Sequence, residues 1–193
     1  MKLERYLTGI LISIFILGGT SIATPSKHIN IQFGRKILNS SDWKPLEEQT
    51  EIGGDFDIKI KNSNTYFVFG LLKSGKSETE TDDFFGTAKL TLTTKEIRLG
   101  LRKYYSGSDT FNLLYGGGIT LGNVDLKFKW NSFEDSVSKF GLGYYLEVAP
   151  TFKLSEGIHA GIKFDYSSFN ITSNSTTTSG GGFHYALFTG VNF

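Results

Sequence analysis

The chain has 193 residues, enough for one domain, and a formal net charge of +1, which argues against a nucleic-acid partner. It contains no cysteine, which excludes disulfides, thiolate chemistry and an acylated N-terminal cysteine. The slightly polar mean hydropathy excludes a helical membrane protein but allows a barrel, in which only alternate residues face lipid. The 23 glycines and the 15% of aromatic residues suit strands that bend at small residues and carry rings at an interface.

Residues 1–23 are predicted to form a secretory signal peptide, so that residues 24–193 form the mature domain. A basic start with Lys2 and Arg5 precedes an apolar run and a small-x-small cleavage site that ends at Ala23. A membrane anchor is the alternative, but the apolar run is shorter than the ~20 residues that a spanning helix needs. We therefore expect cleavage and export.

The mature chain alternates apolar and polar residues in segments that are separated by turn and loop residues. The connections alternate between long and short, which is typical of an even-stranded barrel with both termini in the periplasm and long loops outside. The long loops are predicted to begin at Asn39, Gly75, Asn131 and Asn170. The segment Thr65 to Lys73 is nearly all apolar, so its facing stays open. The predicted strands are 28–38, 51–60, 65–73, 84–105, 111–130, 140–154, 158–169 and 183–193.

Two of these segments, 84–105 and 111–130, are longer than one membrane crossing requires. The apolar residues switch from even to odd positions near Thr93–Lys95, and from odd to even positions at Gly122–Asn123. A bulge or bend would cause such a switch. We therefore predict irregular strands that outrun the bilayer on one side.

The hairpin from Phe140 to Phe169 has the clearest pattern. Every second residue is apolar or aromatic, and Ser155-Glu156-Gly157 supplies the turn. The apolar face is long enough for a tilted strand of about 9–11 residues to cross a bilayer. A soluble lipocalin-like or streptavidin-like barrel is the alternative, because alternation alone does not say which face points inward. The signal peptide, the terminal Phe193 and the aromatic content favour the membrane barrel.

The last strand carries apolar and aromatic residues at alternate positions and ends on phenylalanine; the residues concerned are Tyr185, Leu187, Val191 and Phe193. This pattern resembles the assembly signal by which the barrel-assembly machinery recognises its clients. The strand count, the loop asymmetry and the segments 143–147 and 161–166 resemble the small eight-stranded OmpA/OmpX/opacity-type family of outer-membrane barrels. The resemblance covers essentially the whole mature chain but brings no functional residues.

The resemblance implies an all-β fold, an eight-stranded antiparallel up-and-down transmembrane β-barrel, in the outer membrane of a diderm bacterium. It also implies contact with outer-membrane lipid and lipopolysaccharide, and with periplasmic chaperones and the barrel-assembly machinery during biogenesis. We expect no nucleic-acid partner and no cofactor. The four extracellular loops are expected to meet a surface ligand whose identity the sequence does not give.

If the apolar face points outward, charged residues collect in the lumen. We expect them to neutralise one another, because buried charges persist only when they are paired and hydrogen-bonded. Their mixed signs argue against a selective ion filter. The predicted set is Asp55, Asp57, Lys59, Glu96, Arg98, Arg102, Glu147, Lys153, His159, Lys163 and Asp165.

No catalytic or metal site is predicted. His159 and His184 are not followed closely by the serine that outer-membrane lipid A deacylases carry, and scattered histidines without cysteine argue against zinc. His184 with Ser167 or Glu147 is the one Ser, His and acid set that the pattern assembles. The sequence therefore predicts a non-enzymatic structural or surface-interaction barrel; the alternative is a narrow channel through the polar lumen.

Overall fold

The computed structural model describes residues 26–61, 63–82, 86–173 and 176–193, and the predicted signal peptide lies outside them. The elements are β1 (Lys27–Leu38), a 3-10 helix η1 (Ser41–Trp43), β2 (Glu48–Lys59), β3 (Thr65–Asp82), β4 (Gly86–Ser106), β5 (Phe111–Trp130), β6 (Phe133–Ser155), β7 (Ile158–Ser173), β8 (Thr176–Ser179) and β9 (Gly182–Asn192). Within these ranges no helix is both long and apolar enough to cross a bilayer.

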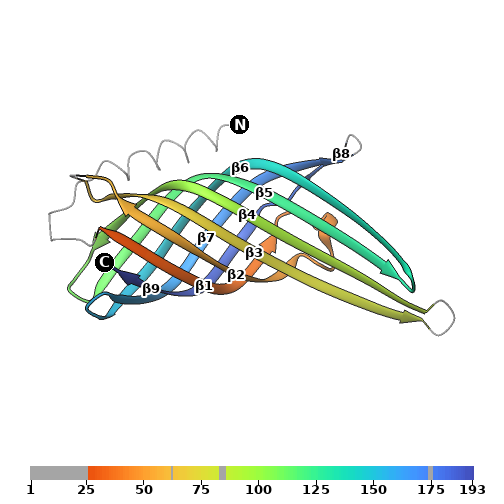
Figure 1. Cartoon of the computed structure of the whole chain (residues 1–193), viewed down its shortest axis with the longest axis horizontal. Coiled ribbons are helices and arrows are strands. Elements are labelled where there is room, and N and C mark those ends of the chain that lie inside the picture. The colour runs from red at the N-terminus through yellow and green to blue at the C-terminus, as the bar shows by residue number, and fades with distance from the viewer. Residues whose placement is uncertain (1–25, 62, 83–85, 174–175) are drawn as a thin grey trace.

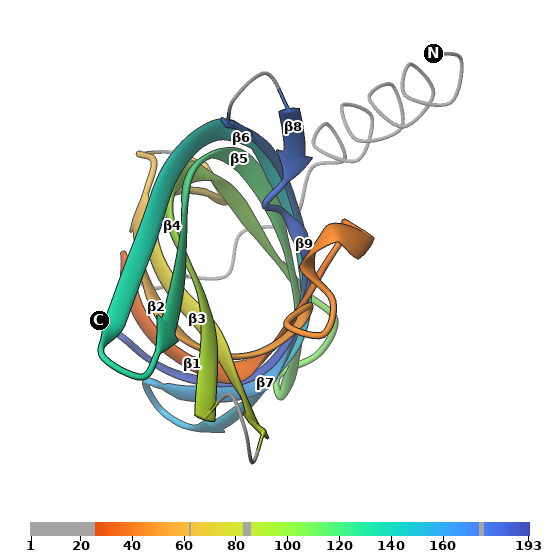
Figure 2. The ribbon, with the colours of Figure 1, turned by 90° about the vertical axis from the view of Figure 1, so that its right-hand side faces the viewer.

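Antiparallel pairing closes β1 to β7 and β9 into a barrel, which Figure 2 shows as a ring of strands. The short β8 pairs with the end of β7. Lys27 and Phe193 exchange backbone hydrogen bonds of 2.9 and 3.0 Å, so the two described ends of the chain lie side by side. This end of the barrel is called the terminal end below, and the opposite end the hairpin end. The predicted eight-stranded antiparallel barrel is confirmed.

Side chains alternate between the lumen and the outer surface along each barrel strand. In the barrel part of β4, Glu96 and Arg98 are buried, while Ile97 and Leu99 are exposed. Exposed aliphatic and aromatic side chains recur on the outer face of all the barrel strands and form an apolar belt. An apolar outer surface around a polar interior is the arrangement of a membrane barrel and the reverse of a soluble one.

The facing of β3, which its apolar sequence leaves open, follows the same rule. Tyr66 and Val68 are buried in the lumen, while Phe67 and Phe69 are exposed in the belt. Even-numbered residues therefore point inward along β3.

Three of the four segments predicted as long loops are mostly paired strand in the structure, so these predictions are wrong. Backbone pairing continues there although the hydrophobic pattern stops. β3 and β4 pair without interruption as far as Asp82 and Gly86, and β5 and β6 as far as Trp130 and Phe133. β7 likewise continues to Ser173 and pairs there with β8. The β3–β4 and β5–β6 hairpins project well beyond the rest of the barrel (Figure 1).

The bends predicted near Thr93–Lys95 and at Gly122–Asn123 are also absent. The register between β4 and β5 is constant through both positions, and even-numbered residues of both strands keep pointing inward. The residue type changes instead: the inward residues of β4 are charged at Glu96 but aliphatic at Leu92. The parity switch marks the place where apolar side chains move from the outer surface to the interior.

Candidate functional site

The lumen near the terminal end holds a cluster of five charged residues around Arg102, which is 1% exposed. Arg102 Nη1 lies 2.7 Å from Asp55 Oδ1 and 2.9 Å from Asp57 Oδ2. Arg102 Nε donates a hydrogen bond of 2.7 Å to Glu147 Oε1. Lys163 Nζ bridges Asp55 and Glu147 at 3.1 Å each. We call these five residues the Arg102 cluster.

A second buried cluster lies closer to the hairpin end, around Glu96. Lys36 Nζ donates to Glu96 Oε1 at 2.7 Å, and Arg98 Nη2 donates to Glu96 Oε2 at 2.8 Å. Arg98 Nη1 pairs with Asp165 Oδ1 at 2.8 Å. Charges out of water are stable only with partners this close. We call Lys36, Glu96, Arg98 and Asp165 the Glu96 cluster. The Glu96 cluster pairs two cations with two carboxylates, whereas the Arg102 cluster has three carboxylates for two cations.

An apolar plug covers the Glu96 cluster on the hairpin side. It consists of Leu38, Leu46, Leu92, Val124, Phe169 and Ile171. Trp43 of η1 packs against it and donates its indole N–H to the carbonyl of Ser179 at 2.6 Å. The connection between β1 and β2 is thereby fixed across the hairpin end of the lumen.

Rings fill the lumen at the terminal end. His28 stacks on Tyr104 with ring centroids 4.5 Å apart and meets the edge of Tyr66 at 4.9 Å. The cavity between the charged clusters, beside Arg98 and Arg102, is only about 10 Å³. Such a volume holds about one water molecule. Between the two clusters the described lumen is therefore filled by side chains.

The structure places eight of the predicted lumen residues in the two clusters and three elsewhere. Lys59 is partly buried near the terminal end. Lys153 is exposed, because it lies beside the turn that follows β6, where the lumen opens to solvent. His159 is buried and bonds Asn30 at 2.8 Å rather than joining a cluster.

Sequence reasoning misses two buried charged residues, Lys36 and Glu51. The signal is present in the alternation, because Lys36 shares its parity with Asn30 and Gln32 on β1. The alternation read in the first strand covers only residues 28–34, so the side chain of Lys36 is not assigned to the lumen.

Ser167, His184 and Glu51 are arranged in the geometry of a catalytic triad. Ser167 Oγ lies 3.0 Å from His184 Nε2, and His184 Nδ1 lies 2.6 Å from Glu51 Oε2. However, Ser167 is 0% exposed, and its hydroxyl also donates to Glu96 Oε1 at 3.1 Å. The Glu96 carboxylate beside this hydroxyl would repel the negative charge that develops on the oxyanion in acyl transfer. The triad geometry is thus part of the buried network, sealed from substrate.

The part of the chain that the structure describes contains no group of three His, Asp or Glu side chains arranged to hold a metal ion.

The residues predicted as an assembly signal, Tyr185, Leu187, Val191 and Phe193, are exposed in the apolar belt or at its edge. Tyr185, Leu187 and Val191 share the outer face of β9 at the seam with β1, and Phe193 follows the last residue of β9.

The outer face of the projecting hairpins carries five exposed lysines, which we call the lysine face: Lys73, Lys89, Lys95, Lys127 and Lys129. Lys73 lies directly opposite Lys95, and Lys89 lies directly opposite Lys129. On the same face, Asp125 accepts a hydrogen bond of 2.7 Å from Lys95. Glu134, also exposed, lies on this face directly opposite Lys129. The five lysines outnumber the two acids, so the face carries a net positive charge.

No protein-family model matches the sequence, and no curated protein sequence matches it significantly. Solved structures do match. The attachment invasion locus protein Ail of Yersinia pestis, in complex with the heparin analogue sucrose octasulfate, is similar with a TM-score of 0.56 at 11% identity, over 87% of this chain and 97% of that one. Neisserial surface protein A has a TM-score of 0.59 at 9% identity, over 89% and 100% of the two chains.

A major outer membrane protein from Thermus thermophilus is similar with a TM-score of 0.57 at 8% identity, over 87% of this chain and 100% of that one. At such identities the likeness concerns the fold. It agrees with the apolar belt and the charged lumen that this chain shows by itself. The chain has the fold of the small eight-stranded β-barrels of the bacterial outer membrane.

Proposed function

We propose that the protein is a non-enzymatic barrel of the outer membrane that binds sulfated sugar chains outside the cell through the lysine face. The sealed position of Ser167 supports the non-enzymatic role. The filled lumen argues against a channel. The hairpins that project beyond the apolar belt provide a surface that lipid does not cover.

The proposal includes a route to the membrane. Residues 1–23 are removed as a signal peptide, periplasmic chaperones receive the domain formed by 24–193, and the assembly machinery reads the outer face of β9. Outer-membrane lipid and lipopolysaccharide then surround the belt. The long hairpins at one end and the short turns at the other support an orientation with the hairpin end outside.

The single observation that carries the proposal is the pairing of like charges on the lysine face. Lys73 lies opposite Lys95 and Lys89 lies opposite Lys129, and like charges directly opposite one another destabilise a sheet. Asp125 beside Lys95 and Glu134 opposite Lys129 offset only part of this repulsion. Lys89 and Lys95 are separated by about 20 Å along an extended strand. A sulfated sugar chain would lay a row of anions along this face and relieve the repulsion. The crystallised complex of Ail with sucrose octasulfate supports this class of ligand.

The experiment is a titration of the folded, detergent-solubilised protein with sucrose octasulfate, compared with elution from immobilised heparin. Replacing Lys89 and Lys129 by glutamine together is expected to weaken binding about tenfold, because two exposed ionic contacts contribute about 0.7 kcal/mol each. Binding to the wild-type protein should also fall as salt is added.

The matched control replaces two exposed lysines at the terminal end, Lys61 and Lys153, by glutamine, which changes the net charge equally. Sucrose octasulfate binding should stay at the wild-type level. If this control loses as much affinity as the Lys89 and Lys129 variant, the effect belongs to net charge and the proposed face is wrong.

A conductance measurement in planar bilayers tests the remaining alternative, a channel through the lumen. The wild-type barrel should be silent, because the two charged clusters and the plug fill much of the lumen. A conductance step that changes in Arg98→Gln would contradict this proposal and restore the channel.

A further inference from the structure

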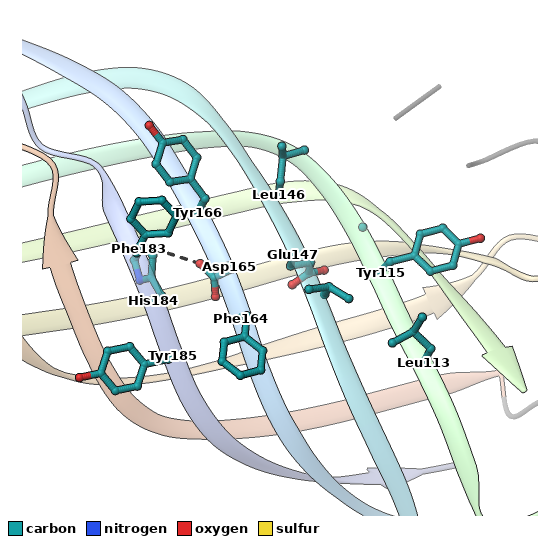
Figure 3. A pocket seen from close by; sticks show the side chains of 12 residues that line it. Leu113, Tyr115, Leu146, Glu147, Phe164, Asp165, Tyr166, Phe183, His184 and Tyr185 are labelled. Carbon is teal, nitrogen blue, oxygen red and sulfur yellow. Dashed lines mark ion pairs between the residues drawn. The ribbon is translucent and has the colours of Figure 1, made fainter. Parts of the chain in front are cut away.

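The outer surface of the barrel contains an apolar groove of about 620 Å³ over β5, β6, β7 and β9 (Figure 3). Its lining residues share the parity of the belt, since Tyr115 and Phe164 point to the same side as the exposed Ile119 and Ile162. Glu147, Asp165 and His184 lie on the lumen side of the same strands. The groove is therefore a feature of the membrane-facing surface, on the opposite face of these strands from the side chains of the charged clusters.

The groove follows a row of residues that are directly opposite one another on successive strands. The row runs from Tyr185 on β9 through Phe164 and Val148 to Tyr115 on β5. Three strand spacings give it a length of about 14 Å. Leu146, Tyr166 and Phe183 form the wall toward the hairpin end, and the rings of the last two are 4.9 Å apart.

The strands of such a barrel are tilted by about 35–45°, so a row across them runs diagonally through the membrane. Tyr115 lies near the start of β5, at the terminal end, while Tyr185 lies near the start of β9, at the hairpin end. A length of about 14 Å is close to half of a hydrocarbon core of about 30 Å. Because the row is diagonal, it covers less than this length along the membrane normal, so the groove accommodates part of an acyl chain within one leaflet.

A positively charged side chain, Arg35, lies at the end of the row that is nearer the hairpin end of the barrel. Arg35 is directly opposite Tyr185 on β1, interacts with the Tyr185 hydroxyl and has a side chain that is 56% exposed. Its Nη1 donates to Glu48, but a guanidinium has five N–H donors in total. Arginine at an apolar surface edge is well suited to a phosphate, which it binds with paired hydrogen bonds.

We propose that this groove is a binding site for one lipid of the outer leaflet, with an acyl chain between Tyr185 and Tyr115 and the lipid phosphate on Arg35. The apolar lining, the position in the belt and the cation at one end together fit a chain with an anionic head. The site lies on β5 to β9, apart from the lysine face on β3 to β5, and does not depend on sugar binding.

The test is native mass spectrometry of the folded protein released from detergent, with dipalmitoyl phosphatidylglycerol as the probe. Dipalmitoylglycerol, which has the same chains without phosphate, is the comparison ligand. The wild-type protein should retain one phosphatidylglycerol in preference to dipalmitoylglycerol. Arg35→Gln should weaken phosphatidylglycerol binding about tenfold, the usual loss for one charge-assisted hydrogen bond, and should leave dipalmitoylglycerol binding unchanged.

Val148→Trp fills the groove and should abolish the retained lipid. Leu121→Trp places the same ring on the outer face of β5 outside the lining and serves as the matched control, which should bind as the wild type does. A shift in gel mobility on boiling shows that each variant is folded. Equal retention in Val148→Trp and Leu121→Trp would overturn the proposal, and so would a protein dimer that Val148→Trp dissociates, since a second copy would then occupy the groove.

Discussion

The belt and the projecting hairpins are built from the same strands with opposite polarity. On β4, Leu99 faces lipid and Arg98 faces the lumen, whereas six residues earlier Leu92 is in the plug and Thr93 is outside. The register does not change between them. Alternation therefore defines two faces, and the solvent around each part of the strand decides which face carries the apolar side chains.

The belt and the projecting hairpins differ in polarity because water is excluded from different faces of the strands in the two regions. In the belt, lipid already excludes water from the outer face, and the lumen has to be filled by polar groups that satisfy one another. Beyond the belt, water covers the outer face, so apolar residues gain free energy by packing inward. The plug of Leu38, Leu92 and Phe169 is the first layer that follows this second rule.

The largest expected effect comes from Arg102→Ala in the belt. This change leaves Asp55, Asp57 and Glu147 buried without their common partner, which costs about 3–5 kcal/mol. Urea unfolding of the protein in lipid vesicles measures it. Lys153→Ala removes an exposed charge from the same barrel and should leave the unfolding midpoint unchanged; an equal loss in both variants would mean that the cluster is not the source of stability.

The difference between the belt and the projecting hairpins is tested most directly by introducing a lysine at either of two positions on the outer face of β4. Leu99→Lys puts a charge against lipid and should cost about 2–4 kcal/mol. Thr87→Lys lies on the same face near the tip of the projecting hairpin, opposite the uncharged Thr81, and should cost nothing measurable. The same unfolding experiment reads both. Similar costs at the two positions would show that the hairpin is also embedded in lipid.

Ser167→Ala tests whether the triad geometry is structural. The change removes hydrogen bonds to Glu96 and His184 and should cost about 1 kcal/mol of stability. Sucrose octasulfate and phosphatidylglycerol should bind as before. Esterase activity toward a fatty-acyl nitrophenyl ester that is present in the wild type and lost in this variant would reverse the interpretation.

The smallest expected effect concerns Asp125 on the projecting hairpin. Partial burial raises the pKa of Asp125, but hydrogen bonds from Lys95 and Ser138 lower it by more, so that the net pKa lies below its ordinary value. Since the folded pKa is depressed, the stabilisation is present at neutral pH and is lost as the pH falls through that pKa. Asp125→Asn should cost about 0.2–1 kcal/mol at pH 7 and nothing in strong acid. A cost independent of pH would exclude the ion pair as its cause.

The fold could be predicted because the alternation of apolar and polar residues along a strand can be read directly from the sequence. The hairpin from Phe140 to Phe169 and the alternation of Asp55 and Asp57 with Phe56 identify both the barrel and its charged side. The projecting strands could not be found in this way. Their pairing is carried by backbone groups, and side chains such as Ser77 and Thr79 have no apolar periodicity to reveal it.

The candidate sites depend on register, which the sequence does not contain. Lys73 and Lys95 are opposite only because β3 and β4 pair in one particular alignment, and Arg35 reaches the groove through its alignment with Tyr185. The parity switch near Thr93 is visible in the sequence and suggests a bulge, although its cause is a change of surroundings. A bulge in the strand and a change from lipid to water around it would both produce this switch in parity, so the sequence alone does not distinguish them.

The uninterrupted register of the projecting hairpins also has a mechanical meaning. The ladder hydrogen bonds run perpendicular to the strands, so a pull on a hairpin along its strands loads its hydrogen bonds to the neighbouring strands together in shear. The same strands continue into the barrel with no linker between them. If a cell were held by these hairpins, the paired strands would transmit the tension directly to the barrel wall. No flexible loop between hairpin and barrel would have to extend first.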